Sequence, residues 1–261
     1  DIDMDINSLD TSSTLDTLND YMAFKDVSDS SITKQMSFQN LAIGMAGDGI
    51  GSAGGTFTLD IADLSTNFSG AVDVANAGSC TALVARAIDA LGGLDVLVNN
   101  AALYGTLKRA PFEKLEEDEW DRVLSVNVKG VWQMTRAASD ALKASGSGSV
   151  INIASATVFS GSPEWMHYVA SKGAVIAMTR VMAKELGGAN VRANVIAPGI
   201  TLTEASLNLM DDAKSYGASR AALKRNGEVD DICGGVLYLA SDLSKYTSGQ
   251  TLVIDGGKQF I

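Results

Sequence analysis

The fold of this chain is decided by the stretch Ser155-Ala-Thr-Val-Phe-Ser-Gly-Ser-Pro-Glu-Trp-Met-His-Tyr168-Val-Ala-Ser-Lys172. The run 150–154 directly before it, apolar except for Asn152, predicts a buried strand that ends at Ser155. From Tyr168 onward, small and apolar residues predict a helix to about residue 186. A strand followed by a helix indicates an α/β sheet, in which functional side chains gather at the carboxyl ends of the strands.

Tyr168 and Lys172 are four residues apart, so a helix places both side chains on one face, one turn apart. A free tyrosine has a pKa of about 10 and transfers protons poorly at neutral pH. A lysine ammonium one turn away favours the phenolate. If the Ser155 hydroxyl faces this pair, it would hold a carbonyl oxygen by a hydrogen bond. The stretch therefore predicts proton transfer by a phenol, although a Tyr-x-x-x-Lys pair alone also arises by chance.

Composition excludes several classes of partner. The 20 basic and 31 acidic residues give a net charge of −11 without a Lys/Arg cluster, which argues against nucleic acid and anionic membranes. No apolar run approaches the ~18 residues of a membrane span, and the N-terminus lacks the pattern of a signal peptide. We therefore expect a soluble, cytoplasmic protein whose 46% hydrophobic content suffices for a sizeable core.

Metal and disulfide chemistry are not expected. Cys80 and Cys233 are too few and too far apart for a disulfide framework or a metal site, so buried free thiols are predicted. His167 is the only histidine, which leaves little for a histidine metal centre or a Ser-His-Asp triad. Its position beside Tyr168 favours a structural role over a role in substrate binding.

Strands and helices alternate after residue 71. We expect strands at 71–74, 94–100, 150–154, 191–196 and 251–257, and helices at 80–91, 112–144, 168–186 and 229–243. This alternation predicts a Rossmann-like, doubly wound parallel sheet in a three-layer α/β/α arrangement, as a single domain over residues 1–261. Residues 1–40 form an atypical N-terminal segment, and residues 202–226 are expected to be a mobile substrate flap.

Asn127 and Gly130 lie inside the expected helix 112–144, where both residue types are unfavourable. Two explanations stand side by side. The helix bends there to present a functional side chain, or it packs closely against a neighbour.

Several motifs together resemble the classical short-chain dehydrogenase/reductase family. They are 99–102 (Asn-Asn-Ala-Ala), Asn127 in its Asn-Val-Lys-Gly setting, Ser155, Tyr168-x-x-x-Lys172, the run from Pro198 to Thr201, and residues 248–257. Ser155 precedes Tyr168 by the family's usual interval, and the likeness covers roughly residues 71–261. Ala102 is a mild departure, because the family usually has glycine there.

The resemblance implies a role for each matched residue. Tyr168 would be the general acid/base, Lys172 would assist it and bond the nicotinamide ribose, Ser155 would polarise the carbonyl, and Asn127 would hold a water in a proton relay. The reaction implied is NAD(P)-dependent interconversion of a ketone and a secondary alcohol. The implied cofactor contacts, besides Tyr168 and Lys172, are Gly47, Gly49, Ile50, Asp73, Val74, Asn99, Ala101, Pro198, Gly199, Ile200 and Thr201. Among them, Asp73 and Val74 would flank the adenine, and Asn99 and Ala101 would line the adenosine ribose side. Ile200 and Thr201 lie in an expected loop at 197–201 and would hold the carboxamide.

The N-terminal part departs from the family. The glycine-rich stretch 44–51 recovers the expected motif only at 49–51, and about twenty residues are missing before Asp73. Either the cofactor lobe is remodelled, or the residues recorded for positions 1–70 are partly uncertain, which is the reading we favour. The mass of the intact chain, compared with 27.2 kDa, separates the two.

The nicotinamide cofactor is expected to be NAD in preference to NADP. Asp60 and Asp63 are both candidates for the acidic residue that binds the adenosine ribose hydroxyls. Asp48 stands where relatives that select NADP often carry a basic residue, and a carboxylate there would repel a 2′-phosphate.

The expected substrate pocket is apolar and aromatic. It comprises Leu103, Tyr104, Thr157, Phe159, Trp165 and Met166 together with the flap, which favours a hydrophobic or aromatic ketone or secondary alcohol. Alternatively, Trp165 and Met166 pack at a subunit contact. The rival substrate is a 3-oxoacyl thioester on a carrier protein, for which the chain offers only a thin basic rim.

Two further expectations concern turnover and assembly. A non-catalytic cofactor-binding protein with a degenerate N-terminal lobe is the alternative from a different class, and the complete set Asn127, Ser155, Tyr168 and Lys172 argues against it. The resemblance also implies a homodimer or homotetramer, formed through the helices 112–144 and 168–186.

Overall fold

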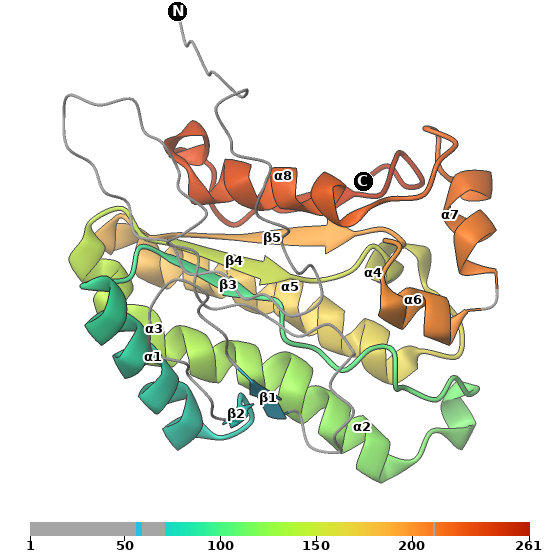
Figure 1. Cartoon of the computed structure of the whole chain (residues 1–261), viewed down its shortest axis with the longest axis horizontal. Coiled ribbons are helices and arrows are strands. Elements are labelled where there is room, and N and C mark those ends of the chain that lie inside the picture. Colours follow the sequence, from blue (N-terminus) through green and yellow to red (C-terminus); the bar gives the residue numbers. More distant parts are fainter. Residues whose placement is uncertain (1–55, 59–70, 211) are drawn as a thin grey trace, which may run out of the picture.

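A four-stranded parallel sheet forms the centre of the computed structural model, which describes residues 56–58, 71–210 and 212–261 (Figure 1). The strand order is β3-β4-β5-β6, with β3 at Val96–Asn99, β4 at Ser149–Ile153, β5 at Arg192–Pro198 and β6 at Thr251–Ile254. Val98 pairs with Ile151, which in turn pairs with Asn194. Every strand of this sheet was predicted, and β3 and β4 are buried throughout, as expected for parallel strands covered on both faces.

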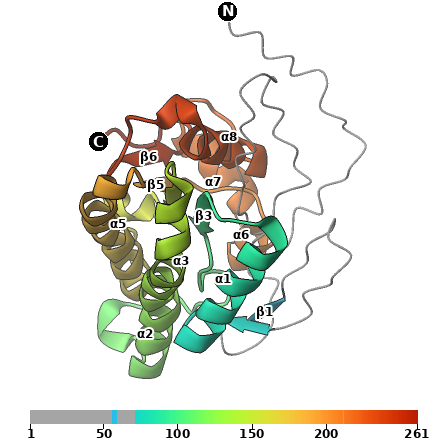
Figure 2. The ribbon, with the colours of Figure 1, turned by 90° about the vertical axis from the view of Figure 1, so that its left-hand side faces the viewer.

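Helices cover both faces of this sheet. Figure 2 shows α8 (Val229–Ala240) on the opposite side from α3 (Val131–Ser145) and α5 (Met166–Leu186). Helix α1 (Ala77–Leu91) packs against α3. The three-layer α/β/α arrangement confirms the predicted Rossmann-like fold class.

Helix α1 begins three residues before its predicted start. The Asn76 side chain accepts a hydrogen bond from the backbone N–H of Ser79 at 3.0 Å and so caps the first turn. Gly92 ends the helix in the left-handed conformation, with φ of 74°, which glycine adopts without steric cost.

The predicted helix 112–144 is four elements rather than one. The 3-10 helix η3 (Phe112–Lys114) precedes α2 (Glu117–Leu124), and a π-helix, η4 (Ser125–Gly130), joins α2 to α3. The interruption therefore falls where Asn127 and Gly130 made a regular helix unfavourable. A Cβ on Gly130 would lie 2.7 Å from Val74 Cγ2, so close packing requires glycine at this position.

One predicted strand pairs differently from expectation. β2 (Ala71–Asp73) pairs antiparallel with β1 (Thr56–Thr58) and lies outside the four-stranded parallel sheet. The prediction that the strand at 71–74 belongs to the parallel sheet was wrong. The pattern of apolar residues predicts a strand, but it does not specify the strand with which it pairs. Gly47, Gly49, Ile50, Asp48, Asp60 and Asp63 lie outside the described residues.

The remaining elements are short. The segment 202–226 contains α6 (Glu204–Leu209) and α7 (Ala213–Arg220), so it is partly helical. Helix α4 (Thr157–Ser160) follows Ser155, while the 3-10 helices η5 (Gly187–Ala189) and η6 (Asp242–Ser244) follow α5 and α8. Pro198, predicted to lie in a loop, is the last residue of β5.

The two cysteines are free thiols. Cys80 is buried, as predicted, and burial raises its pKa to about 11, while Cys233 is half-buried. Across the described ranges, no cluster of three or more His, Cys, Asp or Glu side chains is suited to a metal ion. None of the helices described has both the length and the apolar character needed to cross a membrane.

His167 is buried in the contact between α2 and α5. Its side chain is fully enclosed, and Nε2 lies 3.8 Å from Glu119 Oε2. Burial lowers the pKa of His167 below its ordinary 6.5, and the Glu119 carboxylate opposes that shift with a smaller effect. The folded protein therefore favours neutral histidine, which agrees with the predicted structural role.

Acid should destabilise the fold through His167. Below about pH 6.5 the unfolded chain binds a proton at this histidine while the folded chain resists it, so stability falls as the pH drops towards the lower, folded-state pKa. Because the chain has no other histidine, His167→Gln should flatten the dependence of the urea midpoint on pH between about 5 and 7. An unchanged slope in this variant would contradict the assignment.

The core prediction concerns Leu142 on α3, which is fully buried. Leu142→Ala should lower the free energy of unfolding by about 3 kcal/mol, because a cavity is left where the side chain packed. Leu243→Ala is the matched control, since Leu243 is 66% exposed and its loss should change stability by less than about 0.5 kcal/mol. Urea denaturation of both variants measures the difference, and equal losses would contradict it.

Candidate active site

The carboxyl ends of neighbouring strands bring the predicted catalytic and cofactor loops together. Ser155 follows β4, and Gly199 follows β5, the next strand in the sheet. Backbone hydrogen bonds continue past the strand ends, because the N–H of Ala154 donates to Ile196 O at 2.8 Å and that of Ala156 to Pro198 O at 2.9 Å. The two loops are therefore held side by side at one edge of the sheet.

Tyr168 and Lys172 lie on one face of α5, as predicted, and both side chains are buried. Lys172 Nζ donates a hydrogen bond to the backbone carbonyl of Ile153 at 2.8 Å. The same nitrogen lies 5.8 Å from the centroid of the Tyr168 ring. The ammonium is thus anchored on the end of β4 and stands close to the phenol.

The Ser155 hydroxyl oxygen accepts two hydrogen bonds from Thr157. The Thr157 hydroxyl donates at 2.9 Å and the Thr157 backbone N–H at 3.2 Å. Thr157, which was predicted to line the substrate pocket, is half-buried and starts the short helix α4.

Asn127 is fully buried in the π-helix η4. Its Oδ1 accepts from the backbone N–H of Leu103 at 2.7 Å, and its Nδ2 donates to Leu103 O at 3.2 Å and to Ser171 Oγ at 3.1 Å. Both amide hydrogens are therefore used to hold the loop after β3 against α5. A relay water would therefore have to bind to an oxygen atom or to a backbone group of η4, and not to the side-chain N–H groups of Asn127.

An aromatic cluster surrounds the phenol. The ring of Tyr168 lies 5.4 Å from that of Tyr104 and 5.2 Å from that of Trp165, and the Tyr104 and Trp165 rings meet edge to face at 5.2 Å. Arg109 stacks on Trp165 at 5.7 Å and pairs with Glu164 at 3.3 Å. Aromatic pairs of this kind add about 0.5–1.5 kcal/mol each beyond burial, and the two pairs that involve Tyr168 restrict the orientation of its ring.

The predicted pocket residues differ in exposure. Leu103 and Tyr104 are half-buried beside Tyr168, whereas Trp165 is buried behind it. Phe159 and Met166 are exposed, with 36% and 47% of their surfaces accessible. The structure therefore brings Leu103, Tyr104 and Trp165 to the phenol, and the pocket itself stays a prediction.

The predicted adenosine contacts meet at a small apolar pocket between α1, β3 and α3. Val74, Asn99 and Ala101 all contribute to its lining. Asn99 is nevertheless committed to the protein, because its Nδ2 donates to Thr135 Oγ1 at 2.9 Å and to Asn152 Oδ1 at 2.8 Å. Asp73 caps its own turn by accepting from the N–H of Ala75 at 2.9 Å.

The loop Gly199–Thr201 is packed from both sides. A Cβ on Gly199 would lie 2.7 Å from Asp255 Cβ and 2.8 Å from its Cα, so only glycine fits beside β6. Thr201 forms a β-bridge with Gly227, and the N–H of Leu202 donates to Gly227 O at 2.9 Å. This predicted carboxamide loop is therefore tied to the segment that precedes α8.

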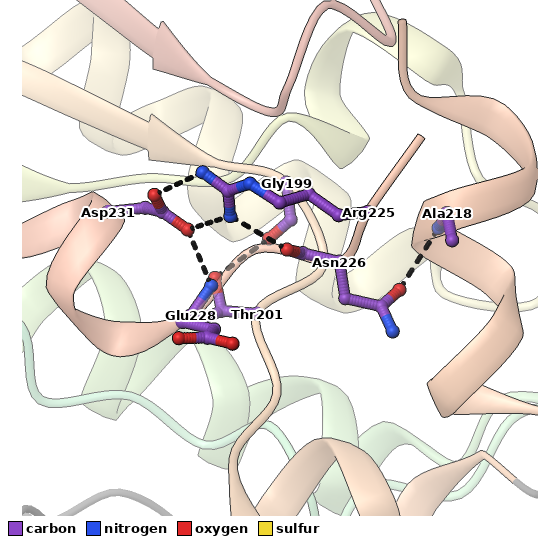
Figure 3. Close-up of polar contacts among 7 residues, drawn as sticks. All are labelled: Gly199, Thr201, Ala218, Arg225, Asn226, Glu228 and Asp231. Atoms are coloured by element: carbon purple, nitrogen blue, oxygen red, sulfur yellow. Dashed lines mark hydrogen bonds and ion pairs between the residues drawn. The ribbon is translucent and has the colours of Figure 1, made fainter. Parts of the chain in front are cut away.

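A polar network joins α7 and the residues that follow it to α8 (Figure 3). Arg225 donates two hydrogen bonds to the Asp231 carboxylate, at 2.6 and 2.7 Å, and these bonds hold the pKa of Asp231 well below its usual range. The Asn226 side chain accepts from the N–H of Ala218 at 3.0 Å and donates to Lys214 O at 2.6 Å. The Asn226 amide therefore bridges two backbone groups that lie one turn apart on α7.

Sequence reasoning missed two side chains that support the site. Gln133 Nε2 donates to the carbonyls of Ala75 and Val74, at 2.7 and 3.3 Å, and so holds the turn that follows β2. Gln259 Nε2, from the chain end, donates to Ala156 O at 3.0 Å. Neither glutamine belongs to a motif, so no local signal identified them.

Comparisons with known proteins agree with this geometry. A family model described as Enoyl-(Acyl carrier protein) reductase matches residues 54–259. The 3-oxoacyl-(acyl-carrier-protein) reductase FabG of Thermotoga maritima is 38% identical over 175 residues, which cover 67% of this chain and 70% of the relative. FabG of Staphylococcus epidermidis is 35% identical over 191 residues, covering 73% and 77%.

A solved structure also matches. It is a gluconate 5-dehydrogenase from Burkholderia cenocepacia in complex with NADP and tartrate, with a TM-score of 0.66 and 35% identity. The match covers 71% of this chain and 72% of that one. The order of strands, the buried Tyr168–Lys172 pair and these likenesses lead to one conclusion: the chain is an oxidoreductase that belongs to the short-chain dehydrogenase/reductase family.

Proposed function

We propose that this oxidoreductase interconverts a ketone and a secondary alcohol with a nicotinamide cofactor, and that Tyr168 is the general acid/base. The observation that carries the proposal is the position of the Lys172 ammonium, 5.8 Å from the Tyr168 ring and anchored on Ile153 O. A cation at this place stabilises the phenolate, so Tyr168 can exchange a proton with a substrate oxygen.

The residues present suit a nicotinamide cofactor. Val74, Asn99 and Ala101 share the lining of one small apolar pocket, so the proposed adenosine contacts lie together, and the Gly199–Thr201 loop follows the strand next to the one that leads to Ser155. Lys172 and the Ile200–Thr201 backbone would hold the nicotinamide end. When bound, the cofactor supplies or accepts the hydride.

The protein's own residues handle the proton and the carbonyl. Ser155 would donate a hydrogen bond to the substrate oxygen and orient the carbonyl carbon, while Tyr168 would pass a proton to that oxygen during reduction. The packing of Tyr104 and Trp165 on the Tyr168 ring keeps the phenol in one orientation. A fixed donor is effective because it needs no reorganisation during the reaction.

The proposed substrate is a hydrophobic or aromatic ketone. Leu103 and Tyr104 stand beside the phenol, and Phe159 is exposed on the α4 side of Ser155. A second candidate is a 3-oxoacyl thioester on a carrier protein, because the FabG relatives are 35–38% identical. The complete set Asn127, Ser155, Tyr168 and Lys172 argues against a cofactor-binding protein without turnover.

We further propose an oligomeric state, a role for the segment 202–226 and a cellular location for this protein. Trp132 on α3 and Val181 on α5 are about half exposed, which favours a homodimer or homotetramer through these two helices. The segment 202–226 would serve as the substrate flap within a single domain, held at its base by Asn226. A cytoplasmic location is inferred from the composition.

Tyr168→Phe should lower kcat/KM for ketone reduction by at least about 100-fold, because the ring stays in place while the transferable proton is lost. Cofactor absorbance with a panel of aromatic ketones and a short 3-oxoacyl thioester measures turnover. Tyr238→Phe is the matched control, since Tyr238 lies on α8 and, within the described part of the chain, its hydroxyl forms a hydrogen bond only with the Thr247 hydroxyl, at 3.3 Å.

Two outcomes of this assay are decisive. Cofactor that binds to the wild type but is consumed with none of the substrates would contradict the enzyme proposal, as would an unchanged rate in Tyr168→Phe. If the 3-oxoacyl thioester is reduced faster than every aromatic ketone, the proposed substrate becomes the 3-oxoacyl thioester.

The cofactor preference is tested by the same reaction. We expect a higher kcat/KM with NADH than with NADPH, because the Asp48 carboxylate next to the glycine motif would repel a 2′-phosphate. Asp48→Arg should narrow or reverse that ratio. Better efficiency of the wild type with NADPH would contradict the preference; the gluconate 5-dehydrogenase structure is a complex with NADP.

A further inference from the structure

The hydroxyl oxygen of Ser155 has its acceptor capacity filled by one neighbour. A hydroxyl has two acceptor lone pairs and one hydrogen. Thr157 supplies a donor for each lone pair, the hydroxyl at 2.9 Å and the backbone N–H at 3.2 Å. Any further hydrogen bond that Ser155 makes through this oxygen must therefore use its own hydrogen.

That hydrogen has no acceptor among the residues that the structure describes. The hydrogen bonds of the Ser155 side chain there are the two that it accepts, and the residue is only 7% exposed. A buried hydroxyl hydrogen without an acceptor is unfavourable, unless a ligand provides the missing oxygen. The hydrogen of the Ser155 hydroxyl is thus available for donation to a substrate oxygen.

The backbone of the same turn is clamped at the residue between the two hydroxyls. The Ala156 N–H donates to Pro198 O at 2.9 Å, and the Ala156 carbonyl accepts from Gln259 Nε2 at 3.0 Å. One clamp comes from β5 and the other from the end of the chain. Because the backbone is held from both sides, the orientation of the Ser155 hydroxyl depends on its contacts with Thr157.

We propose that Thr157 is a positioning residue, whose hydroxyl fixes the Ser155 hydroxyl as a dedicated hydrogen-bond donor to the carbonyl or alkoxide oxygen of the substrate. The proposal rests on the proposed function, which names Ser155 as the group that holds this oxygen. In this proposal Thr157 does not line the substrate pocket, as the sequence predicted, but acts on the substrate through Ser155. Without the threonine hydroxyl, one lone pair of the serine is unfilled and the serine gains a second favourable rotamer.

The first test compares Thr157→Val with Thr157→Ser. Valine keeps the branched shape and the backbone N–H but lacks the hydroxyl, whereas serine retains it. We expect kcat for reduction of the best ketone to fall about tenfold in Thr157→Val, as for the loss of one hydrogen bond, with KM unchanged. Thr157→Ser should stay within about twofold of the wild type. A rise of KM with kcat unchanged would instead identify Thr157 as a pocket wall and overturn the proposal.

A double-mutant cycle separates positioning from a structural role. In a Ser155→Ala background the partner of Thr157 is gone, so Thr157→Val should cause no further loss of kcat. An equal tenfold loss in that background would show that Thr157 acts on the fold of the turn and would overturn the proposal. The melting temperatures of all variants accompany the rates.

A structural arm does not depend on turnover. Crystal structures of the wild type, Thr157→Ser and Thr157→Val should show one Ser155 rotamer in the first two and a changed or divided rotamer in the third. An unchanged single rotamer in Thr157→Val would overturn the proposal. If the wild type reduces no ketone or thioester, the proposed function fails, while the rotamer comparison still decides the role of Thr157.

Discussion

The hydrogen bond from Lys172 Nζ to the carbonyl of Ile153 is the constraint on which the site depends. Ile153 is the last residue of β4, and Lys172 lies on the second turn of α5. A buried ammonium is costly unless it is hydrogen-bonded, so this bond both permits the cation in the interior and sets its place. Because Tyr168 is one turn earlier on the same helix, the bond also fixes the distance between the phenol and the strand end.

Local sequence was sufficient for the parts of the fold that periodicity specifies. The largely apolar runs at 94–100 and 150–154 correspond to β3 and β4, which are buried on both faces of the sheet. Buried parallel strands need such runs, so each run was enough to predict its strand. Tyr168, Lys172 and Ser155 were predicted as one site because a four-residue spacing and a strand end place them geometrically. These three depend on elements that are close in sequence, which is why the prediction reached them.

Contacts between distant segments were beyond that reasoning. Strand β1 (Thr56–Thr58) pairs with β2 (Ala71–Asp73), but the residue pattern of either strand is compatible with several partner strands. Gln259 and Ala156 are 103 residues apart in the sequence, so no spacing rule connects them. Thr157 is a different case, since its position two residues after Ser155 was visible, but the direction of its hydroxyl was not.

The π-helix at Ser125–Gly130 shows why an unfavourable local sequence is useful here. Its wider turn allows Asn127 to reach both the Leu103 backbone and Ser171 Oγ, while Gly130 on the same element packs directly against Val74. One irregular turn thus contacts the loop after β3, helix α5 and the turn after β2, all of which carry residues of the proposed site. A regular helix with larger side chains would be more stable in isolation, but Val74 leaves no room for a Cβ at position 130. The local free energy lost at Asn127 and Gly130 is therefore offset by contacts that hold the two halves of the site in register.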